Sequence, residues 1–167
     1  MMGVAADYRN KGVGRLMKLT QRLDALSRGV ELIEWTFDPL EIKNAFFNIE
    51  RLGAVVRRFV LNQYGTSTSH LHGGLPTDRC VAEWYIGSPR VEIASEGRVP
   101  PRHEIVERIA VPVHIAELKK SDPKRAREIQ LSVSEQFLCH FDKGLAVVGF
   151  EKSEQAGTYL LGPWQSK

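Results

Sequence analysis

The chain contains only two cysteines, Cys80 and Cys139, in 167 residues. They lie far apart, and neither has the short spacing to another ligand that is typical of a metal site, so we expect no disulfide framework and no cysteine-based metal centre. Both are predicted to be small side chains buried in the core. This sparing use of cysteine fits the reducing environment of the cytoplasm.

Long apolar runs and a strong net charge are also missing. No run approaches the roughly 18–20 apolar residues that a membrane-spanning helix needs, and the N-terminus has no basic head followed by an apolar secretory core. The formal net charge is only +3, from 23 Lys and Arg against 20 Asp and Glu, which does not indicate a nucleic-acid-binding surface. We therefore predict a cytoplasmic protein that binds neither nucleic acid nor a membrane.

What the chain does have is a glycine loop between a short apolar segment and a helical pattern. Residues 1–6 are predicted to be the end of a strand, and Arg9-x-x-Gly12-x-Gly14 follows. Backbone N–H groups at a helix start, which glycines allow a ligand to approach closely, form a cradle for anions. A plain strand–turn–helix has the same glycine spacing, so the loop alone leaves both interpretations open.

The segment after this loop predicts an amphipathic helix, because apolar side chains recur every three or four residues from Val13 to a C-terminal Gly29. The predicted inward face contains Val13, Leu16, Met17, Thr20, Leu23 and Leu26. The predicted outward positions include Arg15, Lys18, Arg22 and Arg28.

Two further helices are predicted from capping signals. Asp38 as N-cap, followed by Pro39 and Glu41, predicts a helix that ends at Gly53. A second helix is expected to begin after Asp122 and to end at Gly144.

The remaining segments predict short strands, which makes the fold class α+β. Strands are expected over residues 31–37, 55–61, 79–86 and 109–115, with a hairpin formed by 145–150 and 158–161. Residues 87–104 contain many glycine, proline and charged residues and are predicted to be a linker.

One family shares these features. The run Val4-x-x-x-Tyr8-Arg9-x-x-Gly12-x-Gly14-Arg15, followed by a helix and a strand, resembles the pyrophosphate-binding motif of the GNAT acyl-CoA-dependent N-acyltransferases. The later runs at 35–40, 52–54, 64–65, 75–79 and 83–84 resemble a poorly characterised bacterial branch of that superfamily. The resemblance covers residues 1 to about 85.

For the fold, the resemblance implies a GNAT-like mixed sheet flanked by helices. Residues 1–92 would form an acyl-CoA-binding half-domain, and residues 105–167 a small strand–helix–hairpin extension. In the family, three strands and two helices precede this loop, and the acyl-CoA lies where the fourth and fifth strands separate. Residues 1–6 match the fourth strand, so we expect the domain to be incomplete at its N-terminus.

The co-substrate implied by the resemblance is acetyl-CoA or another acyl-CoA, with no metal. Backbone amides of the loop would hold the pyrophosphate, with a contribution from the helix macrodipole, and the main chain of Val4 and Ala6 would contact the acyl-pantetheine arm. The expected cofactor-binding residues are Val4, Ala6, Arg9, Asn10, Lys11, Gly12, Val13, Gly14 and Arg15.

The catalytic residues are less clear from the resemblance. Many GNAT enzymes use a tyrosine four residues before a Leu-Gly turn to protonate the coenzyme A thiolate, and here Ile49 occupies that position. Tyr64 or Tyr85 could replace it, and we name Tyr64 as the candidate acid. Asp78 is the candidate that orients or deprotonates the amine, and an aspartate that only stabilises a turn is the alternative.

The expected acceptor is an amino acid or another small-molecule amine, contacted by Trp35, His72 and Arg79. His70-x-His72 resembles half of a metal site but has no third ligand at a convincing spacing, so no metal is predicted. A homodimer is one expected assembly. The alternative function is a non-catalytic CoA-binding or interaction remnant of such an enzyme. A Rossmann-type nucleotide site is disfavoured because the third glycine is missing.

Overall fold

The computed structural model describes residues 12–65, 75–102 and 104–164. The strands are β1 (Leu32–Phe37), β2 (Val55–Val60), β3 (Arg79–Tyr85), β4 (Glu107–Pro112), β5 (Leu145–Lys152) and β6 (Ala156–Pro163). The α-helices are α1 (Val13–Ser27), α2 (Ile42–Phe46), α3 (Pro89–Ser95), α4 (Ile115–Ser121) and α5 (Pro123–Asp142), and a π-helical segment, η2 (Phe47–Arg51), continues α2.

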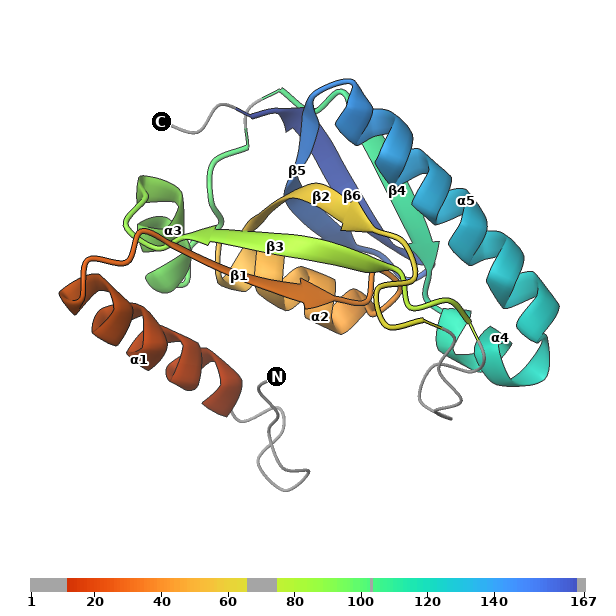
Figure 1. The fold of residues 1–167 in the computed structure, drawn as a ribbon, viewed down its shortest axis with the longest axis horizontal. Helices are drawn as coiled ribbons and strands as arrows, with labels where there is room; N and C mark the ends of the chain where they lie inside the picture. Colours follow the sequence, from red (N-terminus) through yellow and green to blue (C-terminus); the bar gives the residue numbers. More distant parts are fainter. Residues whose placement is uncertain (1–11, 66–74, 103, 165–167) are drawn as a thin grey trace.

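The strands form one six-stranded sheet in the order β1-β3-β2-β5-β6-β4 (Figure 1). The α+β class is confirmed. Each strand pairing among the described residues is antiparallel, so the mixed sheet that was predicted is not seen in this part of the chain. Residues 1–6, which were predicted to be the end of a further strand, lie outside the described residues. Val56 of β2 pairs with Val147 of β5, so the N-terminal and C-terminal segments share the sheet.

The core lies where helices from both halves of the chain meet the sheet. Trp84, Tyr159, Phe137 and Phe150 are among its largest buried side chains. The centroid of the Tyr159 ring lies 4.9 Å from the ring centroid of Phe137 in α5 and 4.8 Å from the ring centroid of Phe150 in β5. Its hydroxyl donates to the Pro39 carbonyl at 2.7 Å. Tyr159 therefore connects α5, the hairpin and the segment that precedes α2.

The predicted helix from Asp38 to Gly53 begins later than expected. Asp38 Oδ1 accepts from the Leu40 N–H at 2.8 Å, which is a local turn, and Glu41 is the N-cap of α2. The capping-box prediction was wrong because the aspartate stabilises its own turn instead of the helix. The predicted end is confirmed, since Gly53 has a φ of 76° directly after the helical segment.

The C-terminal half contains two helices that were not predicted. The expected linker, 87–104, contains α3, and Ser88 caps it by accepting from the Val91 N–H at 3.3 Å. The strand expected over 109–115 is β4, which ends at Pro112, and α4 begins at Ile115. α5 and the β5–β6 hairpin are confirmed. Cys80 is buried as predicted, but Cys139 on α5 is exposed.

Helix α1 presents the opposite face to the one predicted. Leu16 and Leu23 are 67% and 65% exposed, whereas Lys18 is 8% exposed. Arg22 Nε donates to the Ile86 carbonyl at 2.7 Å, and Arg15 Nη2 donates to the Ser95 carbonyl. Backbone carbonyls outside α1 thus bind the side of this helix that carries its basic residues. Helix α1 lies at one side of the sheet (Figure 1). Of the helices described, none is long and apolar enough to cross a bilayer.

Candidate functional site

The start of α1 is the first part of the candidate site. Gly12 is the N-cap, with a left-handed φ of 76°, and no side chain among the described residues caps the helix. The first helical bond is made by the Leu16 N–H to the Gly12 carbonyl at 3.0 Å. The N–H groups of Val13, Gly14 and Arg15 therefore have no partner within the helix, which is the arrangement that an anion cradle requires.

The other predicted cofactor-binding residues are only partly placed. Val4, Ala6, Arg9, Asn10 and Lys11 lie outside the described residues. Arg15 does not extend toward the loop, because its Nη2 donates to the Ser95 carbonyl at the end of α3 at 2.6 Å. In this arrangement Arg15 attaches α1 to α3.

Trp35 of β1 lies next to helix α1. The Lys18 Nζ lies 3.6 Å from the centroid of the Trp35 ring and 5.5 Å from that of Trp84, and it donates to Gln21 Oε1 at 3.1 Å. The two indoles meet edge to face, with 5.9 Å between their centroids. Burial lowers the pKa of the Lys18 ammonium below its ordinary value, while the cation–π contacts favour its charged form.

We expect Lys18→Met to change the free energy of unfolding by less than about 1 kcal/mol at neutral pH, because the thioether can pack on the indoles. The pH dependence should differ more. A lysine whose pKa is lower in the folded state is destabilising while both states are protonated, and this destabilisation is relieved as the pH rises through its folded pKa toward the unfolded value. Urea unfolding at alkaline pH should show wild-type stability rising relative to Lys18→Met. A difference in stability between wild type and Lys18→Met that stays constant across pH would contradict a desolvated Lys18. Lys124→Met, at an exposed position of α5, is the control for replacing a lysine with methionine.

A polar cluster occupies the C-terminal end of β1. The Tyr64 hydroxyl lies 3.4 Å from Thr36 Oγ1, and the Arg79 guanidinium lies 5.6 Å from the centroid of the Tyr64 ring. Arg79 and Lys119 approach Asp38 Oδ2 at 3.7 and 3.4 Å. The fold therefore brings together Tyr64 and Arg79 from the predicted set. His72, and His70 with it, lie outside the described residues.

Asp78 lies next to this cluster but is already engaged. Its side chain is buried, Oδ1 accepts from the Asn62 N–H at 2.9 Å, and Oδ2 accepts from the Ser134 hydroxyl at 2.7 Å. Both carboxylate oxygens therefore stabilise the turn after β2 and its contact with α5. This geometry favours the structural alternative for Asp78 over a proton-accepting role.

A second ionised cluster on the sheet was not found by sequence reasoning. Glu83 is 1% exposed, and it accepts from Arg58 Nε at 3.1 Å, from Arg57 Nε at 2.8 Å and from the Tyr85 hydroxyl at 3.0 Å. A β-bulge between Val56 and Arg58 places two consecutive arginines on the same face. Burial and the hydrogen bond to Glu83 raise the pKa of Tyr85, so its hydroxyl is a poor proton donor.

No family model, curated protein or solved structure matches this chain. A function is therefore inferred from the geometry of the described residues and from the resemblance over residues 1 to about 85. Among residues 12–65, 75–102 and 104–164, no three His, Cys, Asp or Glu side chains are grouped so that they could hold a metal ion.

Proposed function

We propose that this chain is an acyl-CoA-dependent N-acyltransferase of the GNAT type, which transfers an acetyl group to a small-molecule or amino-acid amine. The observation that carries the proposal is the start of α1, where a left-handed Gly12 leaves the N–H groups of Val13, Gly14 and Arg15 without helical partners. Oriented N–H donors and the helix dipole favour a bound diphosphate. The order helix, strand, helix and Leu-Gly turn after this loop agrees with the order that the resemblance implies.

The reaction joins an amine nitrogen to the carbonyl carbon of a thioester while the carbon–sulfur bond breaks. Positioning of the two reactants supplies much of the catalysis, and a backbone amide at Val4 would polarise the carbonyl oxygen. Tyr64 is the proposed donor of the proton that the departing thiolate takes. Trp35, His72 and Arg79 are the proposed acceptor contacts, with Arg79 suited to a carboxylate of an amino acid. The two bonds accepted by Asp78 favour water as the acceptor of the amine proton.

The alternative, a non-catalytic CoA-binding or interaction remnant, is favoured by two observations. Asp78 has no free carboxylate oxygen, and Ile49, at the family's tyrosine position, is fully buried. The two functions differ in turnover: an enzyme releases free coenzyme A thiol from acetyl-CoA in the presence of amino acids, whereas a remnant binds acetyl-CoA without releasing thiol.

The proposed cradle is tested by calorimetric titration of the protein with acetyl-CoA, succinyl-CoA and dephospho-CoA. We expect micromolar binding that Gly12→Glu weakens at least tenfold, about 1.4 kcal/mol, because a carboxylate would lie beside the diphosphate. The matched control is Gly29→Glu at the other end of α1. Both glycines have a left-handed φ, and a Cβ at either would meet nothing within 4 Å, so the two substitutions strain the backbone about equally.

If both variants lose acetyl-CoA binding, strain in α1 is the cause of the loss. Unchanged binding in Gly12→Glu would reject the proposed cradle. Absence of binding by a folded wild-type protein would reject both the enzyme and the CoA-binding remnant, and would leave only an interaction remnant.

A further inference from the structure

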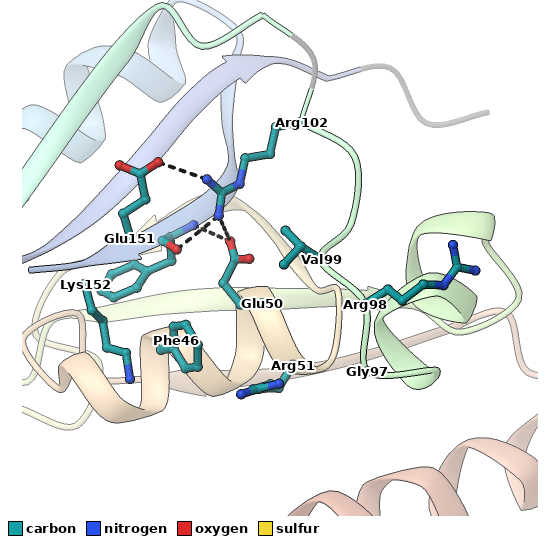
Figure 2. A pocket seen from close by; sticks show the side chains of 10 residues that line it. Phe46, Glu50, Arg51, Gly97, Arg98, Val99, Arg102, Glu151 and Lys152 are labelled. Carbon is teal, nitrogen blue, oxygen red and sulfur yellow. Dashed lines mark hydrogen bonds and ion pairs between the residues drawn. The ribbon is translucent and has the colours of Figure 1, made fainter.

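A separate cavity of about 380 Å³ lies away from the Tyr64 cluster, at the end of β5. Its walls come from α2 and η2, from the segment that follows α3 and from residues 150–152 (Figure 2). The size is within the range of small-molecule sites. Nothing in the proposed reaction uses this cavity.

One wall is held in place by an ion pair between the buried Glu50 carboxylate and the partly exposed Arg102. Glu50 Oε1 accepts from the Phe150 N–H at 2.6 Å and from Arg102 Nη2 at 3.0 Å. Arg102 Nη1 also bonds Glu151 Oε1 at 2.9 Å, so two carboxylates neutralise this guanidinium (Figure 2). The carboxylates of the cavity are therefore engaged with Arg102, and the wall is formed before any ligand binds.

Two cations of the cavity have no carboxylate partner among the described residues. Arg51 and Lys152 are both exposed, and they flank one aromatic ring: the Lys152 Nζ lies 3.9 Å from the centroid of Phe46, and the Arg51 guanidinium carbon lies 5.4 Å from it. Arg98 also lines the cavity, and within the part of the chain that the structure describes its one ion pair is with exposed Glu96. The cavity thus contains an excess of positive charge, which concentrates anions.

The rest of the lining is apolar. Phe46 is partly exposed, and Val99 is 66% exposed at the edge of the cavity. A simple inorganic anion would leave this apolar surface in contact with water, whereas an organic anion would cover it.

We propose that this cavity binds a small organic anion, in which a carboxylate or phosphate group lies between Arg51 and Lys152 and an apolar body packs on Phe46 and Val99. Charge-assisted hydrogen bonds fix the anionic group. The ring and the valine then select organic anions over inorganic ones.

Phenyl phosphate is the probe, titrated by calorimetry at low ionic strength because salt screens exposed charges. We expect saturable binding with a Kd near 1 mM or tighter, roughly what a ligand of this size can gain. Arg51→Glu and Lys152→Glu should each weaken it about tenfold, while Lys143→Glu, the same charge change at the exposed end of α5, should not. Phe46→Leu should weaken phenyl phosphate more than inorganic phosphate.

The proposal is overturned if phenyl phosphate does not saturate by about 10 mM, or if Lys143→Glu weakens it as much as Lys152→Glu. Gly12→Glu separates this site from the α1 cradle: retained phenyl phosphate binding supports the cavity, and lost binding places the probe at the cradle. Backbone amide shifts in the wild-type protein give a reading that needs no variant, and they should concentrate at Phe46, Gly97 and Lys152.

Discussion

Replacing Arg90 with methionine is expected to lower the free energy of unfolding by about 3 kcal/mol, since each buried polar group left without a partner costs roughly 1–3 kcal/mol. Arg90 is 9% exposed. It donates from Nε to the Gly53 carbonyl at 3.0 Å and from Nη2 to the Val148 carbonyl at 2.7 Å. Methionine fills a similar length but leaves both carbonyls unbonded in the interior.

Arg90 remains positively charged although it is buried. Desolvation lowers its pKa to about 10, so the guanidinium is still protonated at neutral pH and donates to the turn after η2 and to β5. The nearby Glu50 carboxylate favours the protonated form.

Thermal unfolding and urea titration measure this effect, which for a domain of this size corresponds to a fall in Tm of roughly 10 °C. Arg127→Met, at an exposed position of α5, is the control and should change stability by less than about 0.5 kcal/mol. Arg90→Lys should recover part of the loss, because an ammonium reaches fewer of these carbonyls. A stable Arg90→Met protein would mean that the two carbonyls find other donors.

Arg90 also shows what the sequence could not reveal. It lies in the stretch predicted to be a linker, where glycine, proline and charge suggested loop structure. The local signal for α3 was present in Ser88-Pro89, an N-cap followed by proline at the first helical position. The bonds to Gly53 and Val148 come from segments 37 and 58 residues away, and no local pattern predicts them.

The elements that were predicted correctly depend on local signals. α5 begins at an Asp122 cap that accepts from the Arg125 N–H at 3.0 Å, and Gly144 follows its end with a φ of 77°. The hairpin after it joins two strands with strong β-patterns. Capping, turn chemistry and periodicity suffice for such elements because all the interacting groups are close in sequence.

The predicted orientation of α1 was wrong for the opposite reason. Periodicity locates an apolar stripe but does not say which side of the helix faces the body. Here Arg22 finds the Ile86 carbonyl and Lys18 finds two indole rings, so the basic side is turned inward. Both sets of partners lie on distant strands or turns, and only the assembled fold supplies them.

The candidate site was predictable in its residue types more than in its geometry. Tyr64 and Arg79 do lie together, but Asp38, expected to cap a helix, is the acid that approaches Arg79. Asp78 is occupied by Ser134 from α5, which sequence spacing could not show. The Glu83 cluster depends on a bulge in β2, and strict alternation along a strand predicts opposite faces for Arg57 and Arg58.

The second large effect is expected at Gly162 in β6, where Gly162→Ala should destabilise the fold by about 3 kcal/mol, at the upper end of the usual overpacking penalty. A Cβ at this position would collide with the backbone carbonyl oxygen of Glu104. That backbone cannot move aside freely, because the Val106 N–H bonds the Leu161 carbonyl at 2.9 Å. The collision therefore falls on a segment fixed to β6, not on a flexible side chain.

The control is Gly87→Ala, where the nearest atom to the new Cβ would be Leu26 Cδ2 at an ordinary 3.8 Å. Both substitutions lower the entropy of the unfolded chain, which alone stabilises the folded state by roughly 0.4–1 kcal/mol. The difference between the two variants in free energy of unfolding, measured with urea, therefore isolates the effect of the collision. Arg102, two residues before Glu104, pairs with Glu50 in the wall of the cavity. A shift of this segment in Gly162→Ala should therefore also weaken phenyl phosphate binding, whereas Gly87→Ala should leave it unchanged. Equal stability of the two variants would show that residues 104–106 do not lie against β6.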